Sequence, residues 1–233
     1  MSMVSDWMGS SATERKRRML LVSFVAMGLL VAIAGVWLLP AGQNMAGESA
    51  NVSAASVDGF RTAQFGSDEK AVRAAITKDF DKSGDAIKII DNPVERTRVL
   101  VVRSDNLFAD STQAEIGYVF GYKSKALIQV NILWGTPLTP AVTQSQLAAM
   151  AATLTRYFAA QGFAAHRVTR NKKLGNGGVL VFQGTDAKGH MVQLVQRMEV
   201  AKGDADKKRM TLRLAYIADP KQPDIFKIAK GAF

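Results

Sequence analysis

The chain has 233 residues, of which 48% are hydrophobic and 21% are charged, and its formal net charge is +10. This composition is ordinary for a globular protein and excludes an intrinsically disordered chain. There is no cysteine, which excludes disulfide bonds, thiolate metal sites, a catalytic cysteine and a lipid-modified cysteine anchor.

The N-terminus combines a basic tail with an apolar segment. Residues 1–18 end in ERKRR, and residues 19–39 follow without a charge. A helix of that length rises about 31 Å, enough to cross a hydrocarbon core of roughly 30 Å. Because positive charges stay on the cytoplasmic side, we expect one transmembrane helix in a bacterial inner membrane, with the C-terminal region in the periplasm. A cleaved signal peptide has the same polarity, but its apolar region is usually shorter, about 7–15 residues.

The rest of the chain divides into a linker, two halves and a tail. Residues 40–58 are small and polar without periodicity, and they predict a flexible linker. We expect a first α+β half at 59–135, a second at 136–218, and a C-terminal tail at 219–233.

The first half is expected to open with a helix near Ser67. Ser67 is a suitable N-cap, and Asp68 and Glu69 would lie in the first turn, where the helix dipole favours acidic residues. An apolar stripe follows at four-residue spacing: Val72, Ile76 and Phe80.

Around this helix, residues 65–76 read FGSDEKAVRAAI. They resemble the opening of small envelope lipoproteins of the SmpA/BamE type, in which a glycine and a polar cap precede the apolar residues of a helix. The resemblance covers about a dozen residues, and this chain lacks the lipoprotein cysteine. It implies a small helix-plus-sheet module used for protein contacts, and no residue role follows from it.

Three strands are expected next, at 97–103, 114–122 and 126–134. The last two are separated by three residues, which predicts an antiparallel hairpin. Alternation in the third strand predicts a core face made of Ile128, Val130, Ile132 and Trp134.

The second half is expected to begin with a helix from Thr139 to Gln161, with Thr139 as N-cap and Pro140 at the first helical position. Its core stripe would be Leu147, Met150, Ala151, Leu154, Tyr157 and Phe158. Strands are expected to follow at 165–170, 178–185, 190–200 and 210–217, with a hairpin turn at 186–189.

Both halves therefore share one order, a helix followed by antiparallel strands. This order predicts the α+β class. A duplicated unit would explain it, and the sequence leaves open whether the two halves share one sheet.

We find no motif that predicts catalysis. His166 and His190 lack the spacing of a helical metal-ligand pair, and the G-x-S-x-G elbow of a serine nucleophile is absent. The glycine-rich residues 175–178 lead into a strand and not into a helix, so they lack a phosphate-binding helix N-terminus. We therefore expect no enzyme, no cofactor and no metal site, although carboxylates that hydrolyse glycans need not be adjacent in sequence.

Charge instead points to a binding role for the second half. Residues 140–233 contain 15 Lys/Arg and 6 Asp/Glu, whereas residues 41–139 contain 11 and 12. The excess favours a phospholipid surface, an acidic partner protein or an anionic envelope polymer, or serves as a solvated basic face. Nucleic acid is not expected, because few aromatic residues are interleaved with the charges. The candidate residues are Arg167, Arg170, Lys172, Lys173, Lys207, Lys208, Arg209 and Arg213.

The C-terminal tail is unusually apolar for a chain end. It either packs back on its own sheet or docks on a partner through Ile225, Phe226, Ile228 and Phe233. Together these features predict a single-pass, periplasm-facing accessory or assembly subunit of a larger envelope or membrane complex. The alternative is a membrane-anchored binding module for an anionic ligand, either a lipid headgroup or a cell-wall polymer.

Overall fold

A computed structural model describes residues 54–175, 177–201 and 204–227. No helix within these ranges is both long and apolar enough to cross a membrane. Three predicted segments lie wholly or mostly outside the described residues: the basic tail 1–18, the transmembrane helix 19–39 and the linker 40–58.

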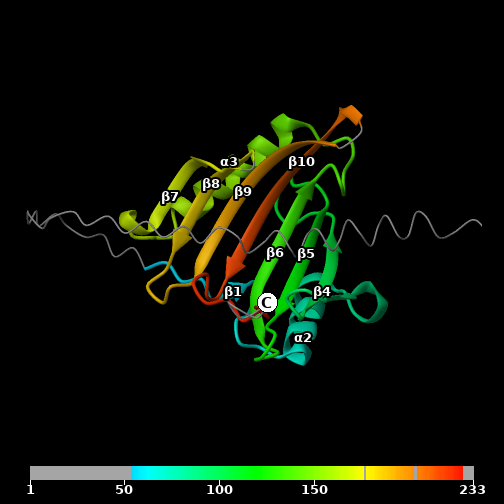
Figure 1. The fold of residues 1–233 in the computed structure, drawn as a ribbon, viewed down its shortest axis with the longest axis vertical. Helices are drawn as coiled ribbons and strands as arrows, with labels where there is room; N and C mark the ends of the chain where they lie inside the picture. The colour runs from blue at the N-terminus through cyan, green and yellow to red at the C-terminus, as the bar shows by residue number, and fades with distance from the viewer. Residues whose placement is uncertain (1–53, 176, 202–203, 228–233) are drawn as a thin grey trace, which may run out of the picture.

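The described chain is α+β, as predicted, and its two halves share one antiparallel sheet of eight strands (Figure 1). The strand order is β3-β4-β5-β6-β10-β9-β8-β7. The last strands of the two halves, β6 and β10, therefore pair at the centre, and the first strands form the edges. The strands are β3 (Lys88–Asn92), β4 (Thr97–Ser104), β5 (Ala114–Phe120), β6 (Leu127–Gly135), β7 (Val168–Lys173), β8 (Gly178–Thr185), β9 (Met191–Ala201) and β10 (Asp204–Ile217).

Shorter elements complete the described chain. A two-stranded ribbon, β1 (Gly59–Phe60) and β2 (Ala63–Gln64), precedes the first helix. Single 3-10 turns, η1 (Gly84–Ala86) and η2 (Ala165–Arg167), precede β3 and β7. The turn η2 explains why β7 begins three residues later than expected. Strand β3 has no clear signal in the sequence, because its adjacent Ile89 and Ile90 do not alternate with polar residues.

The first helix is α2 (Glu69–Phe80). Its N-cap is Asp68 and not Ser67, because the Asp68 carboxylate accepts a hydrogen bond from the main-chain nitrogen of Ala71 at 2.8 Å. The predicted stripe is confirmed at Val72 and Ile76, which are fully buried.

The second helix is α3 (Gln144–Ala159), which begins later than predicted. Thr143 and Gln146 form a capping box: the Thr143 hydroxyl accepts from the Gln146 nitrogen, and the Gln146 side chain accepts from the Thr143 nitrogen. This reciprocal pair provides acceptors for two main-chain N–H groups that have no partner within the helix. A helix that began at the predicted Thr139 would not use this pair. The predicted stripe is correct for Leu147, Met150, Ala151 and Phe158, but Tyr157 is 57% exposed and Leu154 is half-buried.

Both helices pack on the same face of the sheet, where their buried residues join one core with the sheet. Figure 1 shows α3 lying across β8, β9 and β10, in agreement with its contacts to these strands. One row of this core crosses six neighbouring strands through Val102, Ile116, Ile132, Leu214, Leu194 and Phe182.

The core face predicted for β6 is wrong at Ile128. The pairing with β5 shifts between Val119 and Phe120, so that β6 carries one extra residue there. This bulge reverses the alternation: Leu127 enters the main core, and Ile128 packs on the opposite face with Val99, Val101 and Val119.

We call that opposite side of the sheet the second face. No helix of the described residues packs on it, because the buried residues of α2 and α3 all belong to the core on the other side. One of its cross-strand rows runs from β7 to β4 through Lys172, Leu180, Val195, Arg213, Leu133, Glu115 and Arg103.

Candidate functional site

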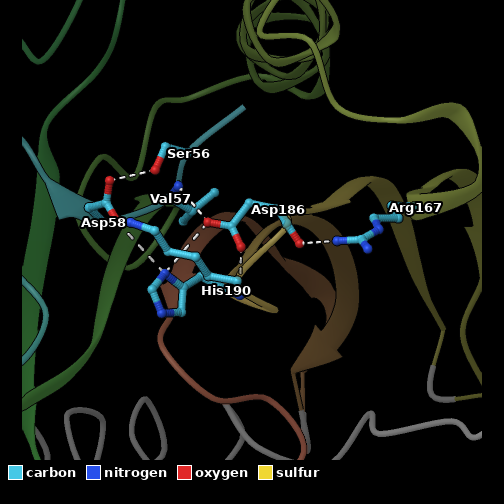
Figure 2. Close-up of polar contacts among 7 residues, drawn as sticks. Ser56, Val57, Asp58, Arg167, Asp186 and His190 are labelled. Atoms are coloured by element: carbon cyan, nitrogen blue, oxygen red, sulfur yellow. Dashed lines mark hydrogen bonds and ion pairs between the residues drawn. The ribbon is translucent and has the colours of Figure 1, made fainter. Parts of the chain in front are cut away.

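Asp186 organises the first polar cluster, which joins the start of the described chain to the turn between β8 and β9 (Figure 2). Its carboxylate accepts hydrogen bonds from the main-chain nitrogens of Val57 and His190, both at 2.9 Å. Its main-chain carbonyl accepts from the Arg167 guanidinium at 2.5 Å. The Asp186 side chain is only 1% exposed, so these donors replace water as its partners. The predicted hairpin turn at 186–189 is confirmed.

Asp58 forms the outer part of this cluster. Its carboxylate accepts from Lys188 Nζ at 2.7 Å and from the Ser56 hydroxyl at 2.5 Å. These two bonds hold the pKa of Asp58 below its ordinary value of 3.8. A carboxylate with a lowered pKa adds stability above its ordinary pKa, and this contribution is lost as the pH falls through the lower folded value. The ring nitrogen Nδ1 of His190 lies 3.9 Å from Asp58 and 3.5 Å from Asp186.

We call this cluster the clamp, because Asp186 and Asp58 hold the first described residues against the β8–β9 turn. A serine nucleophile needs a base that accepts its proton. The Ser56 hydroxyl donates to Asp58, whose lowered pKa makes it a weak base. Among the described residues, no group of three or more potential ligands could hold a metal ion. Ala55 and Val57 are buried, so the folded domain already includes this end of the predicted linker.

Arg213 dominates the second polar cluster, at the centre of the second face. Its Nη2 donates to Gln193 Oε1 at 3.1 Å. Its Nη1 is shielded from solvent and has no hydrogen-bond partner among the described residues. Burial, and then the charge of Arg197, lower the pKa of Arg213 to about 10.

Amide side chains share the second face with this arginine, and Gln193 bonds to it directly. Gln193 donates to Gln183 Oε1 at 3.2 Å, and on β6 Gln129 donates to Asn131 Oδ1 at 2.7 Å. Gln129, Asn131 and Gln193 are buried. Amides provide both donors and acceptors, so this surface can bind polar groups as well as a charge.

The basic residues singled out from the sequence do not all lie on one face of the sheet, as far as their side chains are described. Arg167 binds the Asp186 carbonyl, and Arg170 lies over the Phe182 ring at 5.6 Å on the helix-bearing face. Lys172 and Lys173 are exposed on the edge strand β7, and Arg209 is exposed on β10. Lys207 and Lys208 belong to β10, but their side chains are outside the description. Lys172 and Arg213 share a cross-strand row.

The C-terminal tail packs on the chain itself as far as it is described. The Phe226 ring meets Tyr122 edge-on at 5.5 Å, and the Arg96 guanidinium lies 3.8 Å from its centre. Ile225 is half-buried, and Ile228 and Phe233 lie outside the described residues. These contacts favour packing on the sheet for this part of the tail, and docking on a partner stays a prediction.

Asp224 fixes this tail to the β5–β6 turn. Its carboxylate accepts from the main-chain nitrogens of Lys123 and Ser124 at 3.0 and 2.8 Å. Burial alone would raise the pKa of Asp224, but the hydrogen bonds outweigh it and hold the pKa below its ordinary value.

Replacing Gly121 with alanine is expected to destabilise the protein by about 1–3 kcal/mol, the usual cost of overpacking. A Cβ at this position would lie 2.2 Å from Asp224 Oδ2 and 2.6 Å from Ser124 Oγ. Urea unfolding of the full chain in mild detergent measures the change. Gly175→Ala is the control, because no atom lies within 4 Å of its added Cβ. Equal stability of the two variants would contradict the packing of the tail.

The comparisons with known proteins give no relative: no family model, no curated protein and no solved structure matches the chain. A functional assignment therefore depends on the segments and surfaces described above.

Proposed function

We propose that this chain is a single-pass, periplasm-facing accessory or assembly subunit of a larger envelope or membrane protein complex, in a bacterial inner membrane. The observation that carries the proposal is the second face. It combines apolar residues with amides and an arginine, and arginine is enriched in protein interfaces. The uncharged residues 19–39 after a basic tail support the membrane anchor.

The clamp supports a positional role for the anchor. Asp186 and Asp58 hold the first described residues against the β8–β9 turn. Residues 40–53 would then be the only spacer between membrane and domain, with a reach of about 50 Å at most when fully extended. A partner protein that binds the second face would therefore bind close to the membrane.

The two halves also support an origin by duplication. Each half contains a helix, a 3-10 turn and four strands of the large sheet, although the first half also has the β1–β2 ribbon. Strands β4 and β8 have 8 residues each and stand at the same place in that order. The halves meet through equivalent strands, β6 and β10.

The alternative function is an anionic-ligand module, favoured by the exposed Lys172, Lys173 and Arg209. Such binding would weaken steeply with salt, because exposed charges are screened over about 8 Å at physiological ionic strength. Sedimentation with phosphatidylglycerol liposomes at low and high salt, with Lys172→Glu and Lys173→Glu, tests this alternative.

Gentle detergent extraction followed by native mass spectrometry tests the subunit proposal. A stoichiometric protein partner is the expected result. A monomer that retains lipid or glycan would instead favour the anionic-ligand module.

We expect residues 19–39 to remain in the mature protein, because their length exceeds that of a usual signal peptide. Intact-mass analysis of the membrane fraction checks this directly. A mature N-terminus near residues 42–50 would show that the segment is a cleaved signal.

A further inference from the structure

The charge of Arg213 is not compensated within the described chain. A guanidinium remains protonated in proteins. Arg213 is half-buried and its Nη1 is shielded from solvent, and a charge that is removed from water is costly unless it is paired. No ion pair is formed by Arg213 among the described residues. Glu115 shares its row but lies two strands away, roughly 10 Å, and is paired with Arg103 at 3.2 Å.

The neighbours of Arg213 add to its uncompensated positive charge and do not neutralise it. Val195 and Leu133 lie directly opposite it on β9 and β6, so its flanks are apolar. Arg197, two residues further along β9, adds a second positive charge that contributes to the lowered pKa of Arg213. A low-dielectric site with two guanidinium groups and a free N–H attracts an oxyanion strongly.

We infer that Arg213, on the second face, is the binding site for a carboxylate that an acidic side chain of a partner protein inserts between Val195 and Leu133. The inference rests on the proposed subunit function. The carboxylate takes the free Nη1, while Nη2 keeps its bond to Gln193.

The position of Arg213 favours a protein over a lipid headgroup. Membrane surfaces attract exposed lysine and arginine residues, whereas the free Nη1 is shielded from solvent at the centre of an eight-stranded sheet. Only a group that protrudes from a surface complementary in shape to the sheet can reach this Nη1.

The test uses the full chain in mild detergent with Arg213→Met. Arg209→Met is the matched control, because Arg209 is exposed four residues away on the same strand and the same face. Acetate serves as the carboxylate probe against chloride at equal concentration. Ligands that bind only the folded state raise its stability, so we expect acetate to raise the Tm of wild type and Arg209→Met by about 2–4 °C and to leave Arg213→Met unchanged.

The second readout is the partner complex in gently extracted membranes. We expect Arg213→Met to reduce its yield at least tenfold (~10-fold is 1.4 kcal/mol), and Arg209→Met to retain it. A complex that survives Arg213→Met overturns the inference, as does an equal acetate response in both variants. A retained phospholipid or a second copy of this chain in place of the partner also overturns it.

The two proposals fail separately. Wild type without any protein partner but with an acetate response dependent on Arg213 refutes the subunit function and leaves the carboxylate site standing. Should Arg213→Met lose its folded circular dichroism spectrum, Arg213→Lys decides, because it keeps the charge. An acetate response retained in Arg213→Lys supports the site, and its loss overturns it.

Discussion

Replacing Phe182 with alanine is expected to lower the free energy of unfolding by about 3–5 kcal/mol, the range for truncating a buried aromatic residue. Phe182 is 0% exposed. Its ring stacks on Phe158 of α3 at 5.8 Å and meets Phe163 at 6.0 Å. Because the free energy of unfolding of a domain is only about 5–15 kcal/mol in total, this single change should remove a large part of it.

Thermal and urea unfolding of the full chain in mild detergent measure the loss. Tyr157→Ala is the control on the same helix, because its side chain is 57% exposed and surface changes usually stay within about 0.5 kcal/mol. A Phe182→Ala variant as stable as Tyr157→Ala would show that α3 does not pack on β8 as described.

Replacing Asp186 with alanine is expected to cost roughly 3 kcal/mol. Hydrogen bonds to a charged group contribute about 1.5–3 kcal/mol each, and this carboxylate accepts two, from Val57 and His190. Their loss would leave two donors without an acceptor and would free the first described residues from the β8–β9 turn. Hydrogen exchange at the Val57 amide should therefore accelerate more than exchange in the sheet.

Lys188→Ala separates the clamp from its exposed ion pair. Among the described residues Lys188 bonds to Asp58, and both side chains are about half exposed or more. Because solvent screens such an exposed pair, we expect its loss to cost much less stability than the loss of Asp186. If both variants lose the same stability, or if the Val57 amide exchanges at its wild-type rate in Asp186→Ala, then Asp186 does not hold this segment.

Local signals explain which elements could be predicted. The valine-rich run at 97–103 and the three-residue connection between 114–122 and 126–134 became β4 and the β5–β6 hairpin. The sequence offers two signals for the start of α3, the Thr139-Pro140 pair and the capping-box spacing of Thr143 and Gln146. The capping box sets the observed start. The bulge at Ile128 had no such signal, because it depends on the register with β5.

The candidate sites were harder to predict, since their members are distant in the chain. Val57 and Asp186 are 129 positions apart, and neither is unusual by itself. In the sequence, Arg213 is one of several basic residues in the second half. Its difference from Lys172 and Arg209 is its place at the centre of the sheet, where neighbouring strands exclude water from its Nη1.

The sequence alone determined the α+β class, the helices and most strands, because periodicity and capping depend on residues within a few positions of each other. The pairing of β6 with β10, the shared eight-stranded sheet and the face on which each arginine lies arose from tertiary structure. Strand pairing joins residues far apart in the chain, and a shift of one residue moves every side chain to the other face. For that reason Arg170 and Arg213, which are both basic residues of strands, lie on opposite faces of the same sheet.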